Sequence, residues 1–180
     1  MIAELGHFSL ILALAVAVFQ FVVPMIGASA GNRPMMATAS VAASLQFLLI
    51  AGAMAALTHA YLTSDFSVLN VFQNSHSAKP IIYKVSGVWG NHEGSMLLWV
   101  LILAAFGCAV ALFGNNLPPS LKARVLSVQA LIGIAFLLFI IFVSSPFERL
   151  APVPLEGRGL NPMLQDPALA FHPPFLYAGY

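Results

Sequence analysis

The chain has 180 residues, of which 60% are hydrophobic and 7% are charged, and its formal net charge at pH 7 is +1. An average soluble domain has about 25% charged residues. The few charged residues of this chain cannot cover a water-exposed surface, and we therefore expect a lipid bilayer as its solvent. The basic residues are scattered singly, which excludes a nucleic-acid partner, and the single cysteine, Cys108, excludes an intrachain disulfide and a C-x-x-C-H haem attachment site.

Four stretches of the sequence are long and apolar enough to cross a bilayer as helices. A crossing helix needs about 20 mostly apolar residues, and residues 8–26, 38–62, 95–113 and 125–143 meet this requirement without a Lys, Arg, Asp or Glu. The first stretch is followed by a site that resembles a signal-peptidase site, but no basic residue precedes it, so we expect it to be retained. The sequence predicts an all-α polytopic membrane protein with a four-helix transmembrane module at 1–145.

Polar residues within these stretches are few. Glutamine and serine side chains such as Gln20 and Ser127 are expected to bond across helix interfaces. His59 lies near the end of the second stretch, where a structural or snorkelling role is expected, although an ionisable group in a span is also a functional candidate. Cys108 is expected to be a small packing residue.

The basic residues also predict an orientation. Arg33 lies in the first short connection, and Lys122 and Arg124 lie in the third, with no acidic residue in either. The longer segments 63–93 and 146–180 have fewer basic residues for their length. Since basic residues collect in short cytoplasmic loops, we expect both short connections to be cytoplasmic. Both termini, the long loop and the proline-rich tail would then be periplasmic.

The segment 88–95 leads into the third apolar stretch. Asn91 is a suitable N-cap, Glu93 would place a negative charge in the first helical turn, and Trp89 would lie at the membrane interface. These structural roles explain every residue of the segment except His92.

The tail contains a histidine followed by two prolines, His172-Pro173-Pro174, between Phe171 and Phe175. A residue before proline is driven toward extended backbone angles, so we expect the imidazole of His172 to leave the chain in a restricted direction. A neutral imidazole held beside apolar surface suits an axial ligand of haem iron, and a hydrogen-bonding loop histidine is the alternative.

Two further features of the tail concern charge and length. Arg158 could pair with a haem propionate, but Glu156 is near it in sequence, and a local ion pair is the expected role, as for Arg149 and Glu148. Residues 175–180 are expected to begin a fifth apolar helix that is truncated at the end of this chain.

Three strings carry a family resemblance: WGNHEGS at 89–95, EGRGLNPMLQDP at 156–167 and FHPP at 171–174. They resemble the N-terminal part of the CcmF-type cytochrome c haem lyases, and the similarity extends over essentially the whole chain. The resemblance implies a multi-pass protein of the bacterial inner membrane that acts in cytochrome c maturation. Members of this family receive haem from a haem chaperone and transfer it to the C-x-x-C-H motif of an apocytochrome c.

In that family a tryptophan-rich periplasmic loop cradles haem between two periplasmic histidines, and two transmembrane histidines hold a haem b. His172 matches the first periplasmic histidine. The residues expected to support it are Trp89, His92, Glu93, Arg158, Pro173 and Pro174. The tryptophan-rich loop and the other histidines would lie beyond residue 180, in the remaining part of the lyase, so this chain alone is not expected to be an active enzyme.

Two other functions fit the sequence. A membrane transporter or quinone-site subunit could use His59 and Glu93 as its site, and a non-catalytic structural subunit of the maturation complex would need no site at all.

Overall fold

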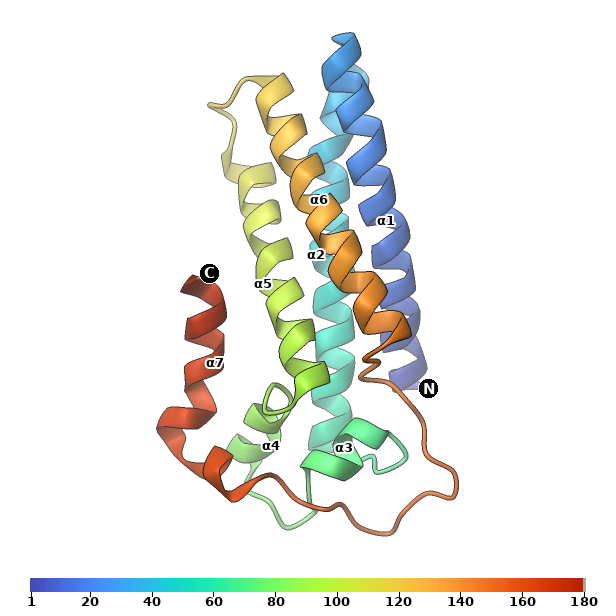
Figure 1. The fold of residues 1–180 in the computed structure, drawn as a ribbon, viewed down its shortest axis with the longest axis vertical. Helices are drawn as coiled ribbons and strands as arrows, with labels where there is room; N and C mark the ends of the chain where they lie inside the picture. The colour runs from blue at the N-terminus through green and yellow to red at the C-terminus, as the bar shows by residue number, and fades with distance from the viewer. Residues whose placement is uncertain (180) are drawn as a thin grey trace.

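Four long helices form a bundle, and shorter segments cover one of its ends (Figure 1). The computed structural model describes residues 1–179. The long helices are α1 (Ile2–Ala30), α2 (Arg33–Leu62), α5 (His92–Phe113) and α6 (Pro119–Phe142). Each is long and apolar enough to cross a membrane, and no strand is assigned within residues 1–179. The prediction of an all-α polytopic membrane protein with four spans is therefore confirmed.

Local sequence signals explain how these helices begin and end. Helix α1 ends at Ala30, and Gly31, which follows it, has a φ of 66° in the left-handed region that glycine adopts readily. The Asn32 side chain then accepts a hydrogen bond from the Met35 backbone N–H and starts α2. At the start of α5, the Asn91 side chain accepts a hydrogen bond from the Gly94 N–H. The N-cap role predicted for Asn91 is thus confirmed.

Helix α1 packs against α2 and α6, and α5 packs against the same two helices. Polar side chains join α1 to α6: the Gln20 Nε2 donates to the Leu126 carbonyl at 3.0 Å, and the Ser127 hydroxyl donates to the Gln20 carbonyl at 3.1 Å. Both side chains are buried, as expected for polar groups that bond across helix interfaces in lipid.

The covered end of the bundle contains the helices α3 (Leu69–Asn74) and α4 (Ile81–Gly87), which lie within the long loop. The first part of the tail crosses this end (Figure 1). There Val68 and Arg149 form an isolated antiparallel bridge. The loop and the tail are therefore joined by backbone hydrogen bonds as well as by side chains.

The tail then forms a short 3₁₀ turn, Pro162–Gln165, and a last helix, α7 (Pro167–Gly179). Helix α7 turns back along the outside of α5 (Figure 1). The helix expected over 175–180 thus begins at Pro167, well before Phe175, and Tyr180 lies outside the described residues. Pro167 itself supplies the reason, because proline is favoured in the first turn of a helix.

Candidate functional site around His172

Helix α7 begins with a capping arrangement at Asp166. One carboxylate oxygen, Oδ1, accepts hydrogen bonds from the backbone N–H groups of Ala168, at 2.9 Å, and Leu169, at 3.2 Å. The Asp166 carbonyl accepts the first helical bond, from the Ala170 N–H. An aspartate followed by proline is a common way to start a helix, so the chain is already helical when it reaches His172.

The expectation that His172 has an extended backbone is therefore wrong, since His172 lies within α7. The restriction that proline places on the preceding residue is a preference of modest size. The cap at Asp166 and the contacts of α7 with α5 outweigh it.

A tryptophan compensates for a hydrogen bond that the prolines remove. Pro173 and Pro174 have no N–H, so the carbonyls four residues earlier, those of Leu169 and Ala170, have no helical donor. The Trp89 Nε1 donates to the Ala170 carbonyl at 2.8 Å. One of the two acceptors that the prolines leave unpaired is thus satisfied by a side chain just before α5.

A second tryptophan holds the far part of α7. The rings of Trp99 and Tyr177 are stacked, with centroids 5.8 Å apart and an angle of 15° between their planes. Trp99 also contacts Phe136 of α6, with centroids 5.0 Å apart. Trp89 and Trp99 therefore attach α7 to the bundle on either side of His172.

The His172 side chain is exposed and makes no hydrogen bond or ion pair with another residue in 1–179. Residues three or four positions away in a helix share a face, and here these are Ala168, Leu169, Phe175 and Leu176, which are all exposed. The imidazole is thus free to bind a ligand and stands on an apolar helix face. Such a face suits a flat apolar macrocycle with a metal at its centre.

The other predicted residues of the segment 88–95 form a junction between helices. The Asn70 side-chain amide donates to Asn91 Oδ1 at 2.7 Å and to Glu93 Oε2 at 3.2 Å. The Tyr61 hydroxyl donates to Asn70 Oδ1 at 2.7 Å and accepts from Asn91 Nδ2 at 3.0 Å. This network joins α2, α3 and α5 beneath the tail, and Glu93 is part of it.

His92 faces a different neighbour. Its Nδ1 lies 2.9 Å from the Ser144 hydroxyl, and its ring meets Phe139 edge-on, with centroids 6.0 Å apart. A hollow of about 320 Å³ between α5 and α6 is lined by His92, Met96 and Phe139 among others. These contacts place His92 against α6, whereas Trp89 and Trp99 contact α7.

Arg158 lies over an aromatic ring, with its guanidinium carbon 5.2 Å from the centre of the Phe72 ring. Glu156 accepts a hydrogen bond from the Ser77 N–H at 2.9 Å. Hydrogen bonds from the side chain and backbone of Ser77 lower the pKa of Glu156 to about 2. The local ion pair expected between Arg158 and Glu156 does not form, because each group has a partner in the loop that the tail crosses.

Arg149 does not form the local ion pair that was expected with Glu148, and its partners lie elsewhere in the chain. Its guanidinium contacts Glu4 Oε1 at 2.5 Å and Asp65 Oδ2 at 3.2 Å. Hydrogen bonds from Ser67 and the charge of Arg149 outweigh partial desolvation and lower the pKa of Asp65. Arg149 thus ties the start of α1 to the end of α2.

Two residues with open roles lie apart from these clusters. His59 is exposed near the end of α2. Cys108 is partly buried, with its sulfur 3.8 Å from the Ser44 hydroxyl. The described residues contain no group of three or more His, Cys, Asp or Glu side chains that could hold a metal ion.

Comparisons with known proteins agree on one family. A family model described as cytochrome C assembly protein matches residues 89–180. The chain belongs to this family. It is 63% identical over 180 residues to the cytochrome c-type biogenesis protein ccl1 of Rhodobacter capsulatus, covering 100% of this chain and 28% of that protein. It is 46% identical over 181 residues to the cytochrome c-type biogenesis protein CcmF of Escherichia coli, again covering 100% of this chain and 28% of that protein.

A solved structure gives the same result for the fold. The structure entitled cytochrome c heme lyase CcmF matches with a TM-score of 0.78 and 28% identity, over 84% of this chain and 26% of that one. The predicted resemblance to the CcmF type is therefore confirmed, and the relatives indicate a role in cytochrome c biogenesis for this multi-pass membrane protein. The chain spans 28% of the length of relatives such as ccl1.

Proposed function

We propose that this chain is the N-terminal membrane module of a cytochrome c haem lyase, and that His172 is an axial ligand of the haem that the complete protein handles. The observation that supports this most directly is the unpaired, exposed imidazole of His172 on an apolar face of α7. The solved relative named as a heme lyase supports the class of reaction.

The residues present fit such a ligand. An axial histidine needs a free ring nitrogen, a fixed position and apolar surroundings for the porphyrin. Leu169, Phe175 and Leu176 provide exposed apolar surface on the same helix face. Trp89 and Trp99 hold the helix to α5.

In this proposal the work of the module is orientation. Bound haem supplies the vinyl groups that react with the thiols of an apocytochrome c. His172 would hold the iron, and α5 fixes the position of His172 through the two tryptophans. Holding two reactants in a productive geometry removes much of the entropic cost of their reaction.

The partners of the complete protein would be a haem chaperone, an apocytochrome c and the rest of the lyase. A second imidazole and a haem-binding loop are supplied in this proposal by the rest of the lyase. The protein would lie in the bacterial inner membrane, with the end that contains α3, α4 and the tail in the periplasm. The position of basic residues in the two short connections supports this orientation.

The test is a His172→Ala substitution in the full-length protein, with haem content measured by absorption spectroscopy and the yield of mature cytochrome c measured in the producing cells. We expect at least a tenfold loss of cytochrome c and a shift or loss of the haem absorption band. Added imidazole should restore part of the band, because it replaces the missing ligand.

His59→Ala is the matched control, since His59 is also an exposed histidine but lies on α2. We expect this variant to keep its haem and its cytochrome c yield. If His172→Ala retained its haem and its cytochrome c yield, the assignment of His172 would be wrong. The hypothesis of a non-catalytic structural subunit would then replace it. If His59→Ala abolished activity while leaving haem in place, a proton or quinone site at His59 would replace the proposal.

A further inference from the structure

The end of the bundle opposite the tail is positively charged. It contains Arg33 at the start of α2 and Lys122 and Arg124 in the first turns of α6. The acidic residues of the chain are Glu4, Asp65, Glu93, Glu148, Glu156 and Asp166, and none lies in the connections or helix ends at this side. The three cations therefore have no acidic side chain to pair with at this end.

Two of these cations line one hollow. It has a volume of about 460 Å³ and lies between the first turns of α2, the α5–α6 connection and the start of α6. Arg33 and Lys122 both line it, together with Asn115 and Ser40. Lys122 Nζ donates to the Ala111 carbonyl at 2.7 Å, which leaves further N–H donors on its ammonium group. The Arg33 guanidinium makes no hydrogen bond or ion pair with another residue in 1–179.

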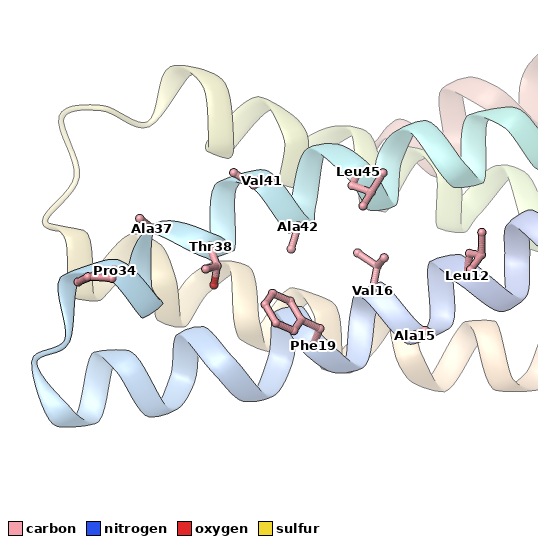
Figure 2. A pocket seen from close by; sticks show the side chains of 10 residues that line it. All are labelled: Leu12, Ala15, Val16, Phe19, Pro34, Ala37, Thr38, Val41, Ala42 and Leu45. Atoms are coloured by element: carbon pink, nitrogen blue, oxygen red, sulfur yellow. The ribbon is translucent and has the colours of Figure 1, made fainter.

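A long apolar groove adjoins this hollow at Ala37, which lines both. The groove has a volume of about 600 Å³ and lies between the middle of α1 and the first half of α2. Figure 2 shows Val16 and Phe19 of α1 facing Ala42 and Leu45 of α2 across it. Apart from the Thr38 hydroxyl, its lining side chains are apolar.

Charge distinguishes between possible occupants of the groove. Its lining runs along α2 from Pro34 to Leu45, about 16 Å at 1.5 Å per residue, and reaches Leu12 on α1, just beyond the middle of that helix. One leaflet of a bilayer has about 15 Å of hydrocarbon, half of a core of roughly 30 Å. The groove therefore starts at the level of the charged connections and extends a little past the bilayer centre. An acyl chain that enters from that end brings its anionic headgroup to Arg33 and Lys122, whereas an apolar crossing helix offers these cations no partner.

We infer that this end of the bundle binds an anionic phospholipid, with the headgroup phosphate between Arg33 and Lys122 and an acyl chain in the groove between α1 and α2. The charged hollow lies at the membrane surface, where the lipid has its headgroup, and the apolar groove extends inward, where the lipid has its acyl chain. Basic pockets between transmembrane helices at the cytoplasmic surface are a known way of binding anionic headgroups. In the proposed orientation, the lipid belongs to the cytoplasmic leaflet.

The test uses the full-length protein in mild detergent and native mass spectrometry to count bound lipids. Dioleoyl phosphatidylglycerol and dioleoyl phosphatidylcholine are added back separately, because they share acyl chains and a phosphate but differ in net charge. The wild-type protein should prefer the anionic lipid. Arg33→Gln should weaken binding of phosphatidylglycerol about fivefold, as expected for one cation near the headgroup, and should weaken phosphatidylcholine binding less, because the choline cation offsets the charge of its phosphate.

Two further variants complete the design. Arg124→Gln is the matched control, because Arg124 is exposed on α6 and lines neither hollow, and it should bind both lipids as the wild type does. Ala37→Phe places an aromatic ring in the groove at an exposed position. This variant should weaken the binding of both lipids while leaving the thermal unfolding temperature unchanged.

Three results would overturn the inference. Equal losses in Arg33→Gln and Arg124→Gln would mean that the lipid responds only to the general surface charge. A lower unfolding temperature in Ala37→Phe with unchanged lipid binding would mean that another protein segment occupies the groove. Displacement of the lipid by millimolar inorganic phosphate would mean that the acyl chain contributes nothing to the site.

Discussion

At the scale of single residues, Gly94 is the position where the chain tolerates a side chain least. A Cβ there would lie 1.6 Å from the Val88 carbonyl oxygen and 2.8 Å from its carbon. These are backbone atoms, so the segment before α5 would have to move, and the cap at Asn91 would move with it. We expect Gly94→Ala to destabilise the full-length protein by about 2 kcal/mol or more, measured as a lower thermal unfolding temperature.

Gly52→Ala provides the comparison for that substitution. Gly52 also lies in a long helix, but the nearest atom to an added Cβ is the Ser9 hydroxyl oxygen at 4.0 Å. Alanine favours a helix over glycine by up to about 1 kcal/mol, so this variant should be as stable as the wild type or more stable. Equal unfolding temperatures for the two variants would contradict the importance of the close contact at Gly94.

The residues that were predictable are those whose role depends on near neighbours in sequence. The cap at Asn91 is a local feature, because its side chain bonds the backbone N–H of Gly94, three residues later. The preference of a residue before proline for extended backbone predicts the wrong state for His172, because the helix start at Asp166-Pro167 outweighs it. The bond from Trp89 to Ala170 joins residues 81 apart, and no local pattern indicates it.

At the scale of elements, α7 depends on the two tryptophans that attach it to the bundle. Trp89→Phe keeps an aromatic ring but removes the N–H that bonds the Ala170 carbonyl. A buried carbonyl without a donor costs roughly 1 to 3 kcal/mol, and Ala170 is buried. We expect the amides of α7 to exchange with deuterium at least fivefold faster in this variant, measured by mass spectrometry of peptides from the full-length protein.

Peptides from α6 serve as the internal reference for that measurement, since α6 has no contact with Trp89 among the hydrogen bonds and ring contacts of residues 1–179. Their exchange should be unchanged. If α7 exchanged at the wild-type rate, the Trp89 bond would not be what holds this helix.

Apolar length alone was enough to predict α1, α2, α5 and α6, because a bilayer requires about 20 apolar residues in a row whatever their neighbours are. The short helices α3 and α4 were not predicted. They lie in a polar loop, and the network around Asn70 that holds them draws on Tyr61, Asn91 and Glu93 from other elements.

At the scale of the whole molecule, the separation of charge predicts how the protein lies in the membrane. Single cysteines at Leu155, which is fully exposed in the tail, and at Asn116, which is exposed in the α5–α6 connection, provide two reporters in a Cys108→Ala background. In the proposed orientation, a membrane-impermeant maleimide added to spheroplasts should label the cysteine at 155. The cysteine at 116 should react only after the membrane is permeabilised, and the reverse pattern would place the tail in the cytoplasm.

The uneven distribution of charge also has a consequence once the protein is inserted. An energised bacterial membrane is negative inside, and moving one elementary charge across it costs about 2.3 kcal/mol per 100 mV. Arg33, Lys122 and Arg124 would all have to move against that voltage for the molecule to turn over. In the proposed orientation, the membrane potential would therefore oppose reversal of the inserted protein.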